Sequence, residues 1–375
     1  MSNRCVAVLG RPDSPTDAVE EYCRYLASAL AAQGTSLQIA RLGWAETGWR
    51  TAIEELSEKF PSQDNSWFLL QYTALAWSRR GFSWRFVSVL RHLKKRGARC
   101  AVVFHDAEAY FGTRFVDRAR RAVQLRTMSN ASRLADLSIF TIPPEKIPWI
   151  VAPSQKTVFI PVGPNLASPE LGWQKTDAKS TAAPTVVVFS LSEGSVGARE
   201  VKQIADAALF AAERFGPLRL LVLGRNSEIA RTYLPERLGV ANVEVTVHGL
   251  LPAEKVVQAL GSCDAMLFVR GPLSTRRGSA IAGIACGLPV IAQQGWETAP
   301  PVTEAGIEFV RPEESNNFGP ALVRVLADPS FRAHLAKQSR EAYVRYFSWE
   351  VIGSQFAEAM QKFGKEPDVL TKFSR

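Results

Sequence analysis

Strand-like and helical patterns alternate along nearly the whole chain, and this alternation constrains the fold more than any other feature of the sequence. Strands that alternate with helices are joined by crossover connections, so they run parallel to one another. We therefore expect an α/β protein with two doubly wound, Rossmann-like domains. The expected strands are 5–10, 36–42, 66–73, 99–106, 135–142 and 157–162 in the first half, and 185–191, 218–224, 243–249, 265–270, 288–294 and 307–312 in the second.

The chain of 375 residues is longer than a single core usually holds. A segment rich in Ser, Ala, Pro and Lys has no periodicity and is typical of a linker. The last helical stretch has no strand of its own left to cover, and we expect it to pack back on the first domain. The predicted parts are a first domain 1–170, a linker 171–184, a second domain 185–348 and a C-terminal helix 349–375.

The composition is that of a packed globular protein, with 46% apolar and 22% charged residues. Its apolar runs are strand-sized, and the sequence enters a strand pattern at Cys5 without a signal-sequence pattern before it. We expect a cytoplasmic protein. The five cysteines form no CxxC pair and are expected to be buried thiols, and the four histidines form no metal-ligand pattern.

The positive charge is concentrated in the first half of the chain. Residues 1–165 carry a formal charge of +8, whereas residues 166–375 carry +1. The segment 79–126 alone carries +10, and the helix expected over 83–97 mixes basic with apolar residues. Such a helix suits the anionic inner face of the plasma membrane, and it equally suits a solvated face over a core-packing stripe. The sequence leaves both interpretations open.

The segment Gly271–Pro289 carries the most specific chemistry. A buried strand ends at Arg270, a polar loop follows, and a helix of small residues begins near Gly278. The free N–H groups of a helix N-terminus beside arginines form an anion site suited to a pyrophosphate. Gly278 would let the backbone approach the phosphate. The further candidate ligands of the phosphate are Arg276, Arg277 and Ser279. The alternative interpretation is a well-packed helix with a basic loop that binds no ligand.

Two segments of the first half end strands at the edge where parallel sheets bind ligands. His105 and Asp106 end one strand, and Glu108 follows them. The loop that begins at Gly10 leads into a helix that Asp17 is expected to cap, with Glu20 completing a capping box.

Several motifs together resemble one known family. AIAGIACGLPVIA resembles the helix-turn-strand signature of GT-B glycosyltransferases, most similar to glycosyltransferase family four. VFHDAEAYFG resembles the histidine-bearing loop of the acceptor domain, FIPVGPNL resembles the segment that enters the interdomain crossover, and LRLLVLGR with VEVTVHGLLPAEKVVQALGSCDAMLFV resembles the later donor-domain strands. STRRGS looks like a variant found in bacterial polysaccharide and lipopolysaccharide transferases.

The resemblance implies a GT-B fold whose two domains face a central cleft, with the donor on the second domain and the acceptor on the first. It implies that His105 orients a substrate and that Asp106 or Glu108 acts as general base. The diphosphate would contact Arg277, Gly278 and Ser279, with Arg276 and Arg199 as further cations. The other implied donor-site residues are Gly10, Arg225, Gly249 and Leu250.

The sequence also departs from the family. The paired glutamates spaced E-x7-E would fall on Ser274 and Ala282, so both carboxylates are missing. The usual Gly-Arg…Lys-Gly phosphate clamp is replaced by SLSEGSVGARE, in which Arg199 is the nearest cation.

The expected activity is transfer of a hexose from a nucleotide-diphosphate sugar to a glycan or lipid-linked acceptor in polysaccharide biosynthesis. From the family we expect retention of configuration, no metal, and no cofactor besides the donor substrate. The alternatives are a nucleotide-sugar 2-epimerase and a non-catalytic protein that binds an anionic polymer. We expect no nucleic-acid partner, because the basic region lacks aromatic RNA-binding signatures.

Overall fold

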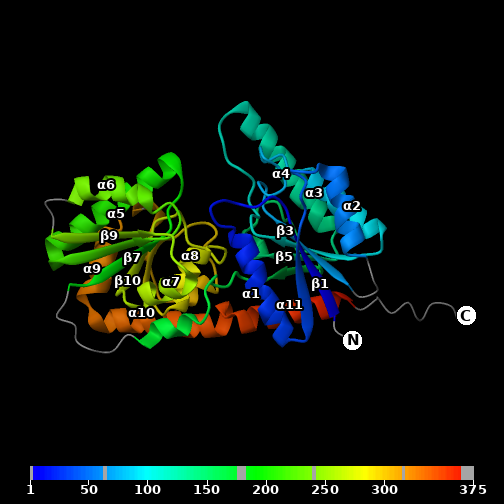
Figure 1. Cartoon of the computed structure of the whole chain (residues 1–375). Helices are drawn as coiled ribbons and strands as arrows, with labels where there is room; N and C mark the ends of the chain where they lie inside the picture. The colour runs from blue at the N-terminus through cyan, green and yellow to red at the C-terminus, as the bar shows by residue number, and fades with distance from the viewer. Residues whose placement is uncertain (1–2, 62–65, 175–182, 239–241, 315–316, 365–375) are drawn as a thin grey trace, which may run out of the picture. The chain divides into compact units, whose positions relative to one another are not determined.

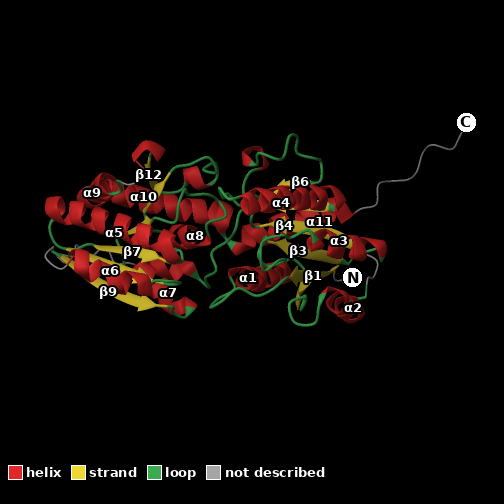
Figure 2. Cartoon of the chain, turned by 90° about the horizontal axis from the view of Figure 1, so that it is seen from above, coloured by secondary structure: helices red, strands yellow, loops and turns green. Residues whose placement is uncertain are grey.

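A computed structural model describes residues 3–61, 66–174, 183–238, 242–314 and 317–364. The chain divides into two compact units, residues 1–161 with 349–375 (unit 1) and residues 162–348 (unit 2). Each unit contains one six-stranded sheet, and all the strand pairings are parallel. Figures 1 and 2 show helices lining both faces of each sheet, which is the expected doubly wound arrangement.

Unit 1 has the strand order β2-β1-β3-β4-β5-β6. Helices α2, α3 and α4 pack on one face and share its core, while α1 and α11 pack together beyond the other face (Figure 1). The elements are β1 (Asn3–Leu9), α1 (Ala18–Ala32), β2 (Thr35–Arg41), α2 (Trp49–Lys59), β3 (Trp67–Tyr72), α3 (Arg85–Lys95), β4 (Arg99–Phe104), α4 (Phe115–Leu134), β5 (Leu137–Phe140), the 3-10 helix η1 (Pro144–Lys146), β6 (Thr157–Phe159) and α11 (Trp349–Gly364).

Unit 2 has the strand order β12-β11-β10-β7-β8-β9. Helices α5, α6 and α9 share a core on one face, and α8 packs against β10 and β11. The elements are η2 (Pro169–Gln174), β7 (Thr185–Phe189), α5 (Gly194–Phe215), β8 (Leu218–Leu223), α6 (Glu228–Leu238), β9 (Val243–Gly249), α7 (Ala253–Gly261), β10 (Ala265–Phe268), α8 (Gly278–Ala285), β11 (Val290–Gln293), η3 (Val302–Glu304), β12 (Ile307–Val310), η4 (Pro312–Glu314), α9 (Gly319–Ala327), α10 (Pro329–Ala342) and the π-helical turn η5 (Tyr343–Phe347).

The boundary between the units lies earlier than the sequence predicted. Residues 162–174 belong to unit 2, because Val162 N donates to Thr275 O (3.1 Å) and Trp173 Nε1 donates to Ala285 O (2.7 Å). Residues 171–174 of the expected linker therefore belong to η2, which packs against α7. Residues 175–182 of the linker lie outside the described part of the chain.

The C-terminal helix α11 belongs to unit 1, where it packs against α1. Trp349 stacks on Tyr25, with ring centroids 5.5 Å apart, and meets Tyr22 edge-on. Further along the helix, a Cβ added at Gly353 would lie only 2.7 Å from the Cβ of Ala29. Residues 365–375 of the predicted terminal segment lie outside the described residues.

The sequence left open whether the apolar side chains of the helix now seen as α3 face a membrane or the core. Its apolar side chains Phe86, Val87, Val89, Leu90 and Leu93 are all buried. The apolar stripe is therefore part of the core, and this helix cannot insert the same side chains into a bilayer. The exposed residues of α3 are Ser88 and the basic residues Arg85, Arg91 and Lys95, and Trp84, which precedes the helix as its N-cap, is 54% exposed.

Candidate functional sites

Each sheet has a switch point, where neighbouring strands lead to connections that turn in opposite directions. Ligands of open α/β sheets bind outside the carboxyl ends of the strands at such points. In unit 1 the switch point lies between β1 and β3, and in unit 2 it lies between β7 and β10. We describe the two edges separately.

The switch point of unit 1 carries a pocket of about 550 Å³. Its lining includes Leu9 at the end of β1, Gly10 after β1, Thr73 after β3, and Asp106 and Glu108 after β4. The loop after β1 is tied to the loop after β3 by a hydrogen bond from Arg11 N to Ala76 O (2.8 Å). Gly10 is required here, because a Cβ at this position would lie 2.3 Å from Ala76 O. The sequence assigned Gly10 to the donor phosphates, and the structure places it in this pocket of unit 1.

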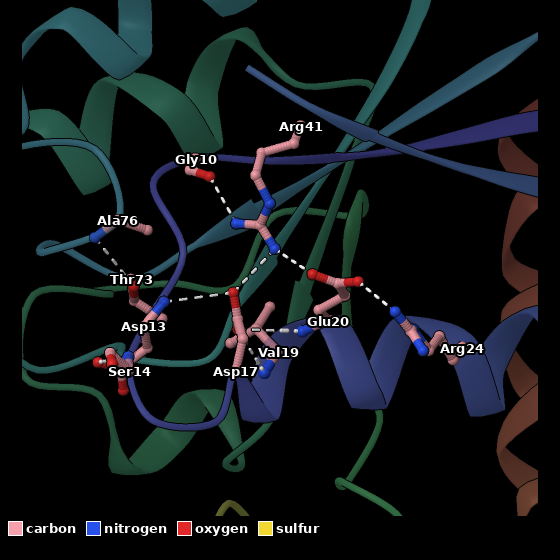
Figure 3. A network of polar contacts seen from close by, with 10 residues as sticks. All are labelled: Gly10, Asp13, Ser14, Asp17, Val19, Glu20, Arg24, Arg41, Thr73 and Ala76. Atoms are coloured by element: carbon pink, nitrogen blue, oxygen red, sulfur yellow. Dashed lines mark hydrogen bonds and ion pairs between the residues drawn. The ribbon is translucent and has the colours of Figure 1, made fainter. Parts of the chain in front are cut away.

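A network of ion pairs supports the same pocket (Figure 3). Asp17 caps α1 by accepting hydrogen bonds from Val19 N and Glu20 N, both at 3.1 Å. Arg41, at the end of β2, donates to Gly10 O (2.8 Å) and to Asp17 Oδ2 (2.9 Å), and it also pairs with Glu20.

The predicted capping box is only half formed. Glu20 does not return to the backbone at Asp17; its carboxylate pairs with Arg24 and Arg41, and these hydrogen bonds lower the pKa of Glu20. Arg41 belongs to β2 and not to α1, so its competition for the carboxylate of Glu20 could not be predicted from the residues near Glu20. The result is a loop after β1 that is held at both ends, which preorganises the pocket.

His105 is held by Gln71, a buried residue of β3. Gln71 Nε2 donates to Leu69 O (3.2 Å), so its Oε1 accepts from Nε2–H of His105 (2.8 Å). This arrangement selects the tautomer in which Nδ1 carries the lone pair. Burial lowers the pKa of His105 to about 4, while nearby Asp17 acts in the opposite direction. His105 is therefore a neutral hydrogen-bonding group near neutral pH and a weak base.

The pocket of unit 1 combines carboxylates with arginines. Asp106 and Glu108 are partly exposed in its lining, which gives them access to a bound hydroxyl group. Nε of Arg11 is buried and has no hydrogen-bond partner among the described residues. Arg120 is held by Asp117, through Nη1 to Oδ1 at 3.0 Å, and lies over the ring of Tyr110. Such a lining suits a polar, hydroxyl-bearing ligand.

At the switch point of unit 2, the loop after β10 is held firmly in place. Leu273 N donates to Gln293 O (2.9 Å), and Thr298 Oγ1 donates to Leu273 O (2.6 Å). Arg276 donates through Nη2 to Glu297 Oε1 (2.7 Å) and through Nε to both oxygens of that buried carboxylate. Arg276, expected to be a phosphate ligand, thus has its charge balanced within the protein and anchors the loop.

Helix α8 begins where the sequence predicted. Arg277 is its N-cap residue and Gly278 its first residue. A Cβ added at Gly278 would meet no atom within 4 Å, so the backbone is open at this point. Further along the helix, a Cβ at Gly283 would lie 2.5 Å from Met266 Sδ, which explains why α8 consists of small residues. Close packing on the sheet and an open N-terminus therefore occur in the same helix.

Arg270, which follows β10 at the start of this loop, was not among the site residues predicted from the sequence. Burial lowers its pKa; Glu200 raises it, and Arg225 lowers it further. Its Nε is buried and has no hydrogen-bond partner among the described residues, and the same holds for Oγ of Ser274 and of Ser227. Buried donors without acceptors are costly. A cation as the last residue of a buried apolar run was the signal that could have identified Arg270.

The other predicted donor-site residues lie on neighbouring elements of unit 2. Arg225 follows β8, and its N–H donates to Ser190 Oγ (3.2 Å) at the end of β7. Gly249 ends β9 with a positive φ of 72°, and Leu250 beside it is exposed. Arg199 is exposed on α5. Ser274 and Ala282, which replace the family's glutamates, are both buried.

Two searches for other chemistry concern only the residues that the structure describes. In those ranges, no group of three or more His, Cys, Asp or Glu side chains is arranged to hold a metal ion. The described helices include none that is long and apolar enough to pass through a bilayer.

Comparison with known proteins identifies the fold. No protein-family model and no curated protein matches the chain. Among solved structures, sucrose-phosphate synthase from Thermosynechococcus elongatus is similar with a TM-score of 0.68 and 19% identity, covering 96% of this chain and 98% of that one. Anabaena HepE in complex with UDP and glucose follows with a TM-score of 0.63 and 14% identity, covering 96% and 99%.

A third similar structure is named as an epimerase and not as a synthase or transferase. It is UDP-GlcNAc 2-epimerase from Neisseria meningitidis bound to UDP-GlcNAc, with a TM-score of 0.58, 11% identity, and coverage of 96% of this chain and 100% of that one. These likenesses extend over both units and include their two parallel six-stranded sheets. The chain therefore has the GT-B fold of two Rossmann-like domains.

Proposed function

We propose that the chain is a glycosyltransferase that moves a hexose from a nucleotide-diphosphate sugar to a glycan or lipid-linked acceptor. The observation that carries the proposal is Arg270, a partly buried cation whose Nε lacks an acceptor in the described protein; Glu200 attracts it and Arg225 repels it. A guanidinium nitrogen that is buried without an acceptor lowers the stability of the protein. A bound diphosphate would supply the missing acceptor and relieve the repulsion.

The donor phosphates would contact the start of α8. Gly278 leaves the backbone open there, and Arg277 precedes it as the N-cap residue. The partial positive charge of a helix N-terminus favours an anion, and Ser279 adds a hydroxyl group. Together with Arg270 and Arg225, this end of α8 would stabilise the negative charge that develops on the leaving nucleoside diphosphate.

The nucleobase would lie near the ends of β8 and β9, against Gly249 and Leu250. Leu250 is exposed, and Gly249 has a backbone conformation that favours glycine. Support for this position comes from its place at the carboxyl edge of the same sheet. Retention of configuration is proposed on the family resemblance alone.

The acceptor would occupy the pocket of unit 1. Asp106 and Glu108 line it, and either carboxylate is suited to accept the proton of an attacking hydroxyl group. His105 is less suited to that task, because burial lowers its pKa to about 4. The described lining of the pocket includes Gln71, to which His105 is hydrogen-bonded, but not His105 itself. We propose that His105 holds Gln71 in place and so orients a substrate hydroxyl group indirectly.

A nucleotide-sugar 2-epimerase is the second candidate, because a solved structure with that name has the same fold. The two functions differ in what happens to the donor when no acceptor is present. A transferase slowly hydrolyses it to a free sugar and a nucleoside diphosphate, whereas an epimerase inverts one carbon and keeps the sugar attached.

The test is to incubate the protein with UDP-, GDP- and ADP-sugars and to follow the products by NMR. We expect release of the free sugar from one donor, and a loss of at least about tenfold in Arg277→Gln. Arg237→Gln, an exposed residue of α6, is the matched control. An inverted but intact nucleotide sugar would favour the epimerase, and no turnover and no binding of any donor would contradict both functions.

A further inference from the structure

The segment that leads into α4 exposes apolar side chains that no core explains. Tyr110, Phe111, Phe115 and Val116 lie within seven positions and are all exposed, Phe115 by 86% and Phe111 by 64%. In Figure 1 the first turns of α4 extend away from the sheet of unit 1. Large apolar side chains gathered in this way on a surface indicate a binding surface for an apolar partner.

Arginines surround these side chains. Arg114, Arg118 and Arg121 recur at helical spacing along the first turns of α4. Arg121 lies over the ring of Phe111, with its guanidinium carbon 3.9 Å from the ring centroid. The one acidic residue of these turns, Asp117, is buried and pairs with Arg114 and Arg120. The exposed charge of residues 110–121, which we call the α4 entry surface, is therefore positive.

The α4 entry surface borders the pocket of unit 1. Tyr110 belongs to both, and Arg120 lies over its ring at 4.8 Å and also lines the pocket. Leu75, another exposed apolar side chain, lines the same pocket from the loop after β3. Whatever binds the α4 entry surface is therefore held next to the proposed acceptor pocket.

We propose that the α4 entry surface binds an anionic lipid bilayer. Exposed aromatic rings insert at the boundary between headgroups and acyl chains, and arginines beside them pair with lipid phosphates. A nucleic acid or an anionic polysaccharide would match the arginines and could stack its rings on Phe111 and Phe115, but it offers no apolar surface for the exposed aliphatic side chains of Leu75 and Val116. Binding of the α4 entry surface to a bilayer does not depend on the proposed function. One consequence does rest on the proposed function: a bound bilayer would present a lipid-linked acceptor to the pocket.

The α4 entry surface lies within the basic region 79–126 that the sequence singled out, but not on the helix expected over 83–97. The apolar side chains of α3 are buried in the core. The basic residues Arg91 and Arg96 remain exposed at α3. Mutating arginines at α3 and at α4 therefore separates a specific surface from general basicity.

The experiment is co-sedimentation of the full chain with vesicles of phosphatidylcholine alone or mixed with phosphatidylglycerol. We expect binding to the mixed vesicles only, weakened by salt. Phe111→Ser with Phe115→Ser should weaken binding about tenfold or more, and so should Arg118→Gln with Arg121→Gln. The controls Val151→Ser and Arg91→Gln with Arg96→Gln should change binding much less; Val151 is 99% exposed in the same unit.

Equal binding to neutral vesicles, an equal effect of the α3 pair, or no effect of the phenylalanine pair would overturn the proposal. So would retention of the protein on DNA or heparin that is as sensitive to the phenylalanine pair as vesicle binding is. Because Phe111 and Phe115 are exposed, these variants are expected to fold normally. Nucleotide-sugar binding measured on the same variants should be unchanged, so a failure here is distinct from a failure of the proposed transferase function.

Discussion

Arg276 and Arg270 lie in the same loop and are both partly buried, but they differ in their hydrogen-bond partners. Arg276 faces a buried carboxylate, Glu297, and forms hydrogen bonds with both of its oxygens. Arg270 has no such partner for its Nε within the described residues. Taking one member of a buried pair away leaves an uncompensated charge, which is costly. Arg276 therefore serves the structure of the loop, and Arg270 is explained best by an anion that binds there.

His105 gives a prediction about pH. Because its pKa is lowered from 6.5 to about 4, the folded protein binds fewer protons than the unfolded chain between these values. The contribution of His105 to the free energy of unfolding is complete above pH 6.5 and is lost as the pH falls toward 4. In urea unfolding at a series of pH values, His105→Gln should show a smaller loss of stability over this window.

His334→Gln is the control for this measurement, because His334 is an exposed histidine of unit 2. Its pH profile should match that of the unchanged protein. If His105→Gln lost stability over the window as steeply as the unchanged protein does, then His105 would not be held neutral by its surroundings.

Sequence reasoning at the scale of single residues identified local features and missed distant partners. Asp17 as a helix cap and Gly278 as the start of α8 were confirmed, because both depend on neighbours a few residues away. The pairing of Arg276 spans 21 positions to Glu297, and neither residue type reveals it. The catalytic roles of His105, Asp106 and Glu108 stay predictions.

At the scale of elements, helix α11 owes its packing to a part of the chain that is far away in sequence. It follows unit 2 in sequence but packs against α1 of unit 1. The two helices approach closely at Gly353, where a Cβ would lie 2.7 Å from the Cβ of Ala29 and 3.0 Å from its backbone carbon. Backbone atoms cannot move aside as a flexible side chain can, so the glycine is needed for this approach.

Gly353→Val should therefore destabilise unit 1 by about 1–3 kcal/mol, because the added atoms force α11 away from α1. The measurement is the free energy of unfolding in urea. Ser354→Val is the matched control, since Ser354 is the exposed neighbour on the same helix and carries the same cost of a β-branched residue. Equal effects of the two substitutions would show that helix propensity, and not packing, explains the loss.

The elements themselves were largely visible in the sequence. All twelve expected strands are present, because apolar and β-branched runs ended by Gly, Asp or Pro are typical of buried parallel strands. The start of unit 2 at Val162 was not visible, since it depends on a hydrogen bond to Thr275. The burial of α3 was not decided either, because an amphipathic stripe looks the same whether it covers a core or a membrane.

At the scale of the whole molecule, both units have a loop that is held by an arginine–carboxylate ion pair. Each unit places a rigid loop at the switch point of a parallel sheet, held by Arg41 with Asp17 in unit 1 and by Arg276 with Glu297 in unit 2. The edge of unit 1 mixes carboxylates with arginines, whereas the described edge of unit 2 presents Arg270, Arg225 and the start of α8. The two edges thus differ in charge, as the proposed binding of a hydroxyl-bearing acceptor at one and a diphosphate at the other requires.

The central claim is that the edge of unit 2 binds the diphosphate of an activated sugar. Isothermal titration of UDP, GDP and ADP into the protein and into Arg270→Met tests it most directly, with thermal unfolding of both proteins without ligand. The account predicts that Arg270→Met binds the preferred nucleotide at least about tenfold more weakly and yet unfolds at the same or a higher temperature, because a partly buried cation has been removed. Unchanged nucleotide affinity together with a lower unfolding temperature would contradict it, since Arg270 would then be a structural residue.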